Sequence, residues 1–308
     1  MSSADSTRRR LVSIVGPTAV GKSALALYLA RRFDGEIVNA DSRQVYRYMD
    51  IGTAKPSQEE RRQVPHHLLD ILDPDQEFSL QLFLKLAREA IDDIHSRNKL
   101  PLLVGGTGQY VWGLLEGWSP PGAAPDPELR TRLQSMGADS LFRELERVDP
   151  ASAAGIGPHN VRRLVRALEV YHQTGVPFSR AKRKDSPEYD SLMLGLTVPR
   201  LELYERIDNR IDIMMDSEWI EEVKALLERG YTQDLPSMSS VGYAELAAHL
   251  RGQILLQEAV QKAKHRTHRF ARHQYAWFRL RDPRIRWLDS TPGAAMMAEG
   301  LVRAFLGT

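Results

Sequence analysis

An eight-residue glycine loop near the N-terminus constrains this chain more than any other segment. It fits the pattern GxxxxGK[ST], and its residues are Gly16, Pro17, Thr18, Ala19, Val20, Gly21, Lys22 and Ser23. The apolar run 11–15 before it is typical of a buried strand, and 23–33 repeats apolar residues at helical spacing. Strand, glycine loop and helix in this order predict a phosphate-binding βα unit.

The loop type indicates how a phosphate group would be held. Its backbone N–H groups point inward at phosphate oxygens, and the helix N-terminus adds partial positive charge. We expect Lys22 to reach the terminal phosphate and the Ser23 hydroxyl to ligate Mg²⁺, which neutralises charge on phosphate oxygens. Both phosphoryl transfer and departure of a diphosphate suit such a loop.

Strands and helices alternate in the segments around this loop. Residues 36–40 and 100–104 read as strands, with a helix over 80–94 between them, which predicts a parallel α/β sheet. The proline-rich stretch 118–127 starts a different pattern, with helices over 129–145 and 161–171. We therefore expect a P-loop NTPase-like core, 1–117 and 197–308 with C-terminal helices, and a mainly helical insertion over 118–196. Residues 189–198 form a further strand candidate, and 201–229 and 255–280 are long helical stretches.

Composition narrows the class of protein. With no cysteine, a disulfide framework, a thiolate nucleophile and a Cys-based zinc site are excluded. No stretch approaches the length of a membrane span, and the polar N-terminus lacks the apolar core of a signal peptide. The formal net charge is only +2. We expect a cytoplasmic globular enzyme, with a monomer as the default state.

Asp41 follows the second predicted strand, at the edge of the sheet where ligands of α/β proteins bind. It is a candidate general base, and equally a candidate cap for the segment after it. No Asn-Lys-x-Asp element for guanine is present, which argues against a GTPase. A small-molecule kinase, with Asp41 orienting a hydroxyl, remains an alternative.

Six further motifs carry a specific resemblance: DSRQVY at 41–46, MDIGTAKP at 49–56, PHHLLDI at 65–71, VGGTGQY at 104–110, RLVRALE at 163–169 and SVGY at 240–243. Together with the P-loop they resemble the tRNA dimethylallyltransferase family over about 11–289. The resemblance implies transfer of a dimethylallyl group from dimethylallyl diphosphate to the N6 amine of the adenosine 3′-adjacent to the anticodon, with release of diphosphate and with Mg²⁺ as cofactor.

The resemblance also assigns residues. It implies that Thr18 contacts the donor near its bridging oxygen, that Arg210 grips the diphosphate and that Asp41 is the general base. It implies tRNA contacts at Asp41, Ser42, Arg43, Gln44, Thr107, Arg130, Arg162, Arg163, Leu164, Val165 and Arg166. The departures are Gln109, where relatives usually carry leucine, and Arg272-His273-Gln274, where Lys-Arg-Gln is frequent.

The residues themselves also point to an RNA partner. Segment 262–286 holds nine Lys or Arg against one acid, Asp282, and interleaves four aromatics, Phe270, Tyr275, Trp277 and Phe278. Cations neutralise phosphates and rings stack on bases, although aromatics at helical spacing more often face a core. A second basic cluster lies at 180–184. A third possibility is a non-catalytic RNA-binding protein with a vestigial P-loop. Such a protein would be expected to have lost Lys22, Ser23 or Asp41, but all three are present.

Overall fold

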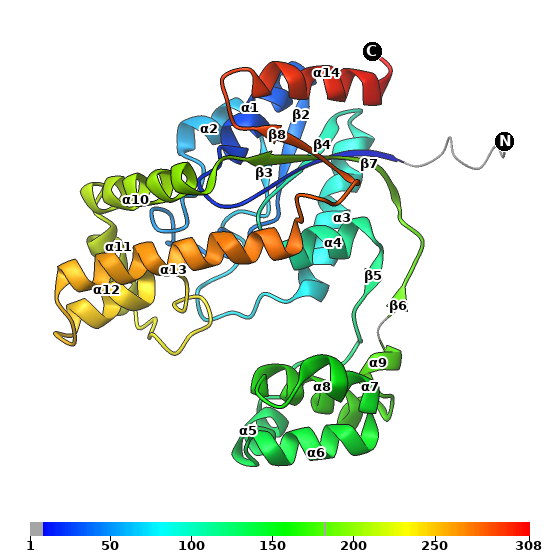
Figure 1. The fold of residues 1–308 in the computed structure, drawn as a ribbon, viewed down its shortest axis with the longest axis vertical. Coiled ribbons are helices and arrows are strands. Elements are labelled where there is room, and N and C mark those ends of the chain that lie inside the picture. The colour runs from blue at the N-terminus through cyan, green and yellow to red at the C-terminus, as the bar shows by residue number, and fades with distance from the viewer. Residues whose placement is uncertain (1–8, 182) are drawn as a thin grey trace. The chain divides into compact units, whose positions relative to one another are not determined.

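The computed structural model describes residues 9–181 and 183–308, which form two compact units. The larger unit, Met1–Leu115 with Pro187–Thr308, contains a six-stranded sheet in the order β3-β2-β4-β1-β7-β8, and all neighbouring pairs are parallel (Figure 1). The strands are β1 (Arg9–Val15), β2 (Gly35–Asn39), β3 (His66–His67), β4 (Leu100–Val104), β7 (Tyr189–Thr197) and β8 (Ile285–Asp289). The predicted P-loop NTPase-like sheet is confirmed.

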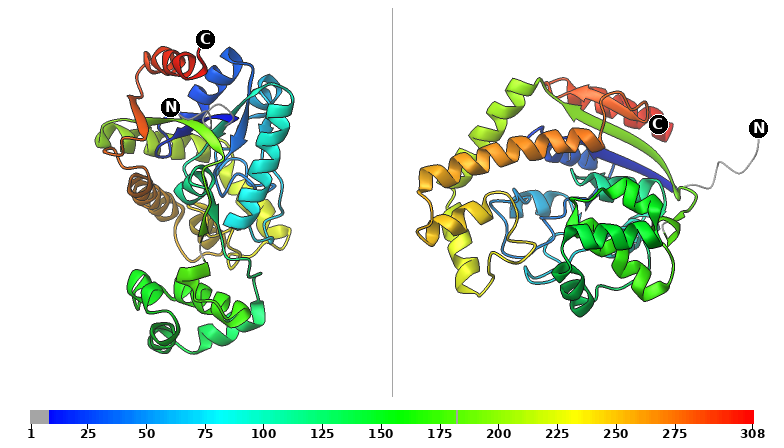
Figure 2. Two further views of the ribbon diagram at one scale, coloured as in Figure 1. Left: turned by 90° about the vertical axis from the view of Figure 1, so that its right-hand side faces the viewer. Right: turned by 60° about the horizontal axis from the view of Figure 1, so that its bottom comes forward.

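Helices cover both faces of this sheet. Figures 1 and 2 show α1 and α14 on one side of it and α3, α4 and α13 on the other. β2 and β4 are buried along their whole length, as parallel strands covered on both faces must be. The helices of this unit are α1 (Lys22–Arg32), α2 (Gln58–Gln63), α3 (Leu80–Ser96), α4 (Gly108–Leu115), α10 (Arg200–Asp216), α11 (Trp219–Glu228), α12 (Tyr243–Leu250), α13 (Leu256–Trp277) and α14 (Ala294–Leu306).

The strand order brings three loops together. β1 lies between β4 and β7, and β4 lies between β1 and β2. Because the carboxyl ends of parallel strands meet at one edge of a sheet, the loops that follow β1, β2 and β4 are neighbours there. These loops are the P-loop, the segment that begins at Ala40 and the segment that begins at Gly105.

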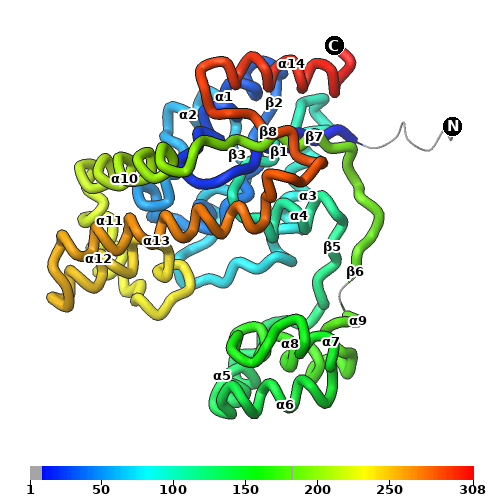
Figure 3. The backbone as a smooth tube through the Cα atoms, in the orientation of Figure 1, coloured from blue at the N-terminus to red at the C-terminus, as the bar shows by residue number. Residues whose placement is uncertain are grey.

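The smaller unit, Glu116–Ser186, has a core of its own. Figure 3 traces the chain out of α4 into this unit and back into β7. Its elements are β5 (Trp118–Ser119), α5 (Pro127–Ser135), α6 (Ala138–Val148), α7 (Pro150–Ile156), α8 (Val161–Thr174), α9 (Phe178–Ala181) and β6 (Arg183–Lys184), with β5 antiparallel to β6. Leu141, Leu145, Leu164 and Leu168 are fully buried at its centre.

Three expected boundaries differ from the structure. The insertion ends at Ser186 rather than at 196, because β7 pairs with β1 and β8 and belongs to the main sheet. The helix expected over 129–145 is broken near Gly137, whose φ of 77° is left-handed. The stretch 201–229 is two helices, because Glu218 has a φ of 68° that no helix can continue through.

The apolar positions of the long stretch lie largely in the core, as expected. Ile207 and Ile211 on α10 are buried, and Met214 and Met215 are half-buried against the same core. Within the described residues, no helix combines the length and the apolar character that crossing a membrane requires. Most of the polar N-terminal segment, residues 1–8, lies outside the described residues, as does Lys182 of the second basic cluster.

Candidate functional site

The P-loop has the curled backbone that its sequence predicts. Gly16 and Gly21 adopt φ values of 136° and 96°, which favour glycine. A Cβ atom at Gly16 would also lie 2.5 Å from the carbonyl oxygen of Leu196, so the loop passes close to the end of β7. Gly21 caps α1, whose first residues are Lys22 and the exposed Ser23. The loop therefore places its amide groups, the lysine and the serine hydroxyl at the sheet's carboxyl edge.

Lys22 is the half-buried cation of this loop. Its Nζ donates a hydrogen bond of 2.7 Å to the carbonyl of Pro17. Burial lowers the pKa of Lys22 from 10.5 to about 8; the charge of Asp41 opposes this change and the charge of Arg210 adds to it. Lys22, Asp41 and Arg210 are thus within electrostatic reach of one another, although they come from α1, the end of β2 and α10.

Asp41 is fixed by a short turn after β2. Its N–H donates to Oδ1 of Asn39 at 3.0 Å, and its own Oδ1 accepts from the N–H of Arg43 at 2.8 Å. Asn39 Nδ2 donates to the carbonyl of Asp41, which closes the turn. Asp41 therefore does the capping that the sequence suggested as its structural role, and the same contacts hold its half-buried carboxylate beside Lys22.

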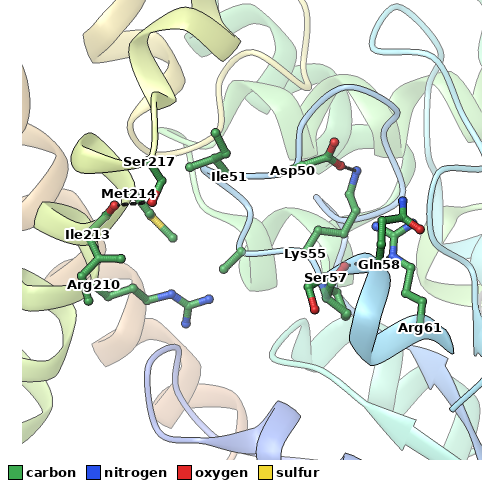
Figure 4. Close-up of a pocket in the computed structure, with 12 residues that line it drawn as sticks. Asp50, Ile51, Lys55, Ser57, Gln58, Arg61, Arg210, Ile213, Met214 and Ser217 are labelled. Atoms are coloured by element: carbon green, nitrogen blue, oxygen red, sulfur yellow. Dashed lines mark hydrogen bonds and ion pairs between the residues drawn. The ribbon is translucent and has the colours of Figure 1, made fainter. Parts of the chain in front are cut away.

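Arg210 lines a pocket of about 460 Å³ beside this site. Figure 4 shows its guanidinium pointing into the space between α10 and the loop that follows Asp50. Lys55 in the opposite wall is paired with Asp50 and Asp70, whereas Arg210 has no ion pair among the described residues. Burial lowers the pKa of Arg210, and Asp41 opposes this. The remaining lining residues are Ile51, Ala54, Pro56, Ser57, Gln58, Arg61, Ile213, Met214 and Ser217.

The predicted tRNA-contacting residues of the larger unit lie around Asp41. The N–H of Ser42 donates to Oγ1 of Thr107 at 3.1 Å, and the N–H of Thr107 donates to the carbonyl of Ala40 at 3.3 Å. Arg43 donates to the carbonyl of Pro236 and Gln44 donates to the carbonyls of Thr53 and Ala54. The structure thus brings 41–44 and Thr107 together at the carboxyl edge of the sheet.

The other predicted tRNA contacts lie in the smaller unit, where some of the side chains are paired or buried and others are exposed. Arg130 and Arg166 both bind the fully buried Glu169, at 2.8 Å and 2.5 Å. Leu164 and Val165 are 0% and 4% exposed in the unit's core, because they fall on the apolar face of α8. Their side chains are not open to a partner. Arg162 and Arg163 are exposed in the first turn of α8.

Two of the four aromatics of the basic segment are exposed. Phe278 is fully buried and Tyr275 is half-buried, but Phe270 and Trp277 are 43% and 41% exposed. The interpretation that all four aromatics pack inward is therefore wrong for two of them. They lie on α13 near exposed arginines, and proteins that bind single-stranded nucleic acid combine exposed aromatics with positive charge in this way.

Two residues to which the sequence assigns no role organise the site. Gln274 on α13 accepts a 2.8 Å hydrogen bond from the N–H of Thr18, so it touches the P-loop from 256 residues away. Glu222 on α11 accepts from the N–H groups of Asp50, Ile51 and Gly52 and so holds the loop opposite Arg210. Neither position has a local sequence signal, because both act through long-range contacts.

Two protein-family models match this chain, and both cover parts of the site. The IPP transferase family model matches residues 44–281, and the isopentenyl transferase model matches 9–70. The chain belongs to the IPP transferase family. The resemblance seen in the sequence motifs is thereby confirmed.

Relatives in this family match nearly the whole chain. A tRNA dimethylallyltransferase of Roseiflexus castenholzii is 53% identical over 298 residues, covering 95% of this chain and 97% of the relative. The protein of the same name from Thermomicrobium roseum is 50% identical, covering 93% and 88%.

Solved structures of IPP transferases match as well. The full-length tRNA isopentenylpyrophosphate transferase of Bacillus halodurans is 39% identical with a TM-score of 0.74, covering 97% of each chain. A eukaryotic dimethylallyltransferase acting on tRNA is 30% identical with a TM-score of 0.86, covering 97% of this chain and 80% of that one.

Proposed function

We propose that this chain transfers a dimethylallyl group from dimethylallyl diphosphate to the N6 amine of the adenosine 3′-adjacent to the anticodon in tRNA, and releases diphosphate. The observation that carries the proposal is that Lys22, Arg210 and Asp41 lie within electrostatic reach of one another at the P-loop. Two cations suit a departing diphosphate, and a carboxylate within electrostatic reach of both suits a proton acceptor. The names of the relatives give the same reaction class.

In the proposed reaction the P-loop stabilises a leaving group and moves no phosphoryl group. The bond between the allylic carbon and the bridging oxygen breaks, and its electrons leave with the diphosphate. Backbone N–H groups, Lys22 and Arg210 stabilise the charge that develops on its oxygens. Thr18 lies in the middle of the loop, where the family resemblance places the bridging oxygen. Lys22 exchanges its Pro17 carbonyl for a phosphate oxygen when the donor binds.

The acceptor amine forms the new carbon–nitrogen bond and loses a proton. We assign that proton to Asp41, whose carboxylate is held in place by the Asn39 and Arg43 contacts. A neutral exocyclic amine is a weak nucleophile, so its alignment with the allylic carbon matters as much as the base. An adenine stacked in the anticodon loop must leave the stack to reach this site.

Mg²⁺ fits the residues present. Mg²⁺ is usually bound by one or two protein groups, water and substrate phosphates, and Ser23 offers an exposed hydroxyl at the first turn of α1. The residues that the structure describes contain no cluster of three His, Cys, Asp or Glu that would hold a metal without a substrate. When bound with the diphosphate, the ion would neutralise part of its charge.

The finer assignments concern partners and place. We propose dimethylallyl diphosphate as the donor, the anticodon stem-loop as the part of tRNA recognised, with Arg162 and Arg163 among its contacts, and a monomer acting in the cytoplasm. The charge of α13 and the exposed Phe270 and Trp277 support an RNA partner. Light scattering with and without an anticodon stem-loop would test the monomer.

The decisive experiment follows label from donor to nucleoside. Unmodified tRNA, Mg²⁺ and radiolabelled dimethylallyl diphosphate are incubated with the wild type, Asp41→Asn or the control Asp190→Asn, which changes an exposed aspartate at the other end of the sheet. Digestion of the RNA should show label on adenosine for the wild type and the control, and almost none for Asp41→Asn. RNA binding without label would favour a binding protein, and ATP-dependent phosphorylation of a small metabolite would favour a kinase.

A further inference from the structure

Gln274 is a buried amide on a helix whose neighbouring positions are basic and exposed. Its side chain is 3% exposed, while Arg272 and His273 beside it are exposed. A buried amide destabilises a fold unless its polar atoms are hydrogen-bonded. Both ends of this amide are bonded to backbone: Oε1 accepts from the N–H of Thr18 at 2.8 Å, and Nε2 donates to the carbonyl of Gly106 at 3.1 Å.

The two partners dictate the side-chain type. The N–H of Thr18 requires an acceptor and the Gly106 carbonyl requires a donor, and an amide of this length satisfies both at any pH. The same requirement fixes the orientation of the Gln274 amide, with its oxygen toward Thr18 and its nitrogen toward Gly106. Gly106 fits the contact closely, because a Cβ atom there would lie 1.9 Å from Nε2 of Gln274.

The bridge joins the two sides of the proposed reaction. Thr18 belongs to the P-loop, where the diphosphate departs. Gly106 precedes Thr107, which bonds to the carbonyl of Ala40 through its N–H and to the N–H of Ser42 through Oγ1. Thr107 therefore holds both chain neighbours of Asp41, which are Ala40 and Ser42. Gly105 packs as closely, since a Cβ there would lie 2.3 Å from the backbone of Ala40.

We propose that Gln274 is a positioning residue that sets the separation between the P-loop and Asp41. It does not touch the reacting atoms. It keeps the departing diphosphate and the proton acceptor at the spacing that an in-line transfer needs, and an error of about 1 Å in such a spacing can cost about 100-fold in rate. The inference rests on the proposed prenyl transfer.

The test compares single-turnover transfer with saturating donor and tRNA. Gln274→Met keeps the length but removes both hydrogen bonds, and Gln274→Glu keeps the acceptor but lacks the donor while its carboxyl is ionised. Gln261→Met makes the first change at an exposed site on α13. We expect both Gln274 variants to lose about 10- to 100-fold in the rate constant, with KM for the donor changed by less than about threefold and Gln261→Met unchanged. Melting temperature and the active-site titre report folding separately.

The pH dependence of the Gln274→Glu rate distinguishes a positioning role from a merely structural one. A protonated carboxyl offers one donor and one acceptor, as the amide does, and burial raises the pKa of a carboxyl. The ratio of the variant's rate constant to that of the wild type should therefore rise as pH falls, at constant active-site titre. A rate constant per active site within about twofold of the wild type in folded Gln274→Met, or a ratio for Gln274→Glu that does not change with pH, would overturn the inference. Absence of label in the wild type would instead refute the proposed function.

Discussion

The lowered pKa of Lys22 makes a specific prediction about donor binding. The free site holds the ammonium at a pKa of about 8 instead of 10.5, which corresponds to a cost of at most about 3.4 kcal/mol for keeping it charged there. The causes are burial and the nearby Arg210, and a bound diphosphate reverses both by supplying negative charge. Binding is therefore strongest when Lys22 is protonated, which holds below pH 8.

The sign and size of the pH effect follow from this value. Well above pH 8 the protonated fraction of Lys22 decreases about tenfold for each pH unit. Between pH 7.5 and 9.5 it decreases about 25-fold for a pKa of about 8. Dimethylallyl diphosphate, an ester of diphosphate, is already fully ionised over this range, because the last pKa of a phosphate ester lies near 6. Without tRNA it can bind but not react, and its dissociation constant in the presence of Mg²⁺ should therefore rise about 25-fold between these two pH values.

Isothermal titration calorimetry of the wild type and two variants would measure it. In Lys22→Arg the guanidinium stays charged throughout, so the affinity should lose its pH dependence even if its absolute value is weaker. Lys85→Arg, a change at an exposed lysine of α3, should behave as the wild type. A wild-type affinity that stays constant from pH 7.5 to 9.5, or an equal decline in Lys22→Arg, would refute the assignment of the titrating group.

Three further predictions concern single residues. Arg210→Ala removes an arginine that has no ion-pair partner in the described structure, so KM for the donor should rise about 10- to 100-fold with little change in melting temperature; an unchanged KM would remove Arg210 from the donor site. Asp41→Asn should lower kcat about 100-fold or more while the dissociation constant for diphosphate stays equal or improves, and a normal single-turnover rate would contradict its role as base. Glu169→Gln leaves the two arginines that bind it without their carboxylate and should destabilise the smaller unit by about 2 kcal/mol, measured by urea denaturation; a midpoint equal to that of the wild type would show that the pairing contributes nothing.

The core of the fold could be predicted because its signals are local. β1 and β4 are short apolar runs bounded by turns, and the P-loop has fixed spacing between its glycines and its lysine. The position of Asp41 at the carboxyl edge of the sheet was also predictable, since parallel strands deliver the residues after their carboxyl ends to one edge. Such features need no knowledge of distant contacts.

What the sequence did not reveal depends on backbone exceptions or long-range contacts. The break between α10 and α11 lies at Glu218 in a left-handed conformation, and neither glycine nor proline marks it. Gln274 and Glu222 act on loops far away in the chain, so their roles appear only after folding. In contrast, burial of Leu164 was open to prediction, because Leu164 and Leu168 are four residues apart on the apolar face of a helix.

The charges at the P-loop also imply an order for the last steps of the proposed reaction. In the free site, Asp41 offsets the repulsion between Lys22 and Arg210, since it opposes the lowering of both pKa values. When Asp41 takes the amine's proton it becomes neutral, and the two cations then act on the diphosphate without that opposing charge. Diphosphate is therefore held most tightly just after transfer, and its release becomes easier once Asp41 has lost the proton to solvent. Loss of that proton and departure of the product are thus coupled through the same three side chains.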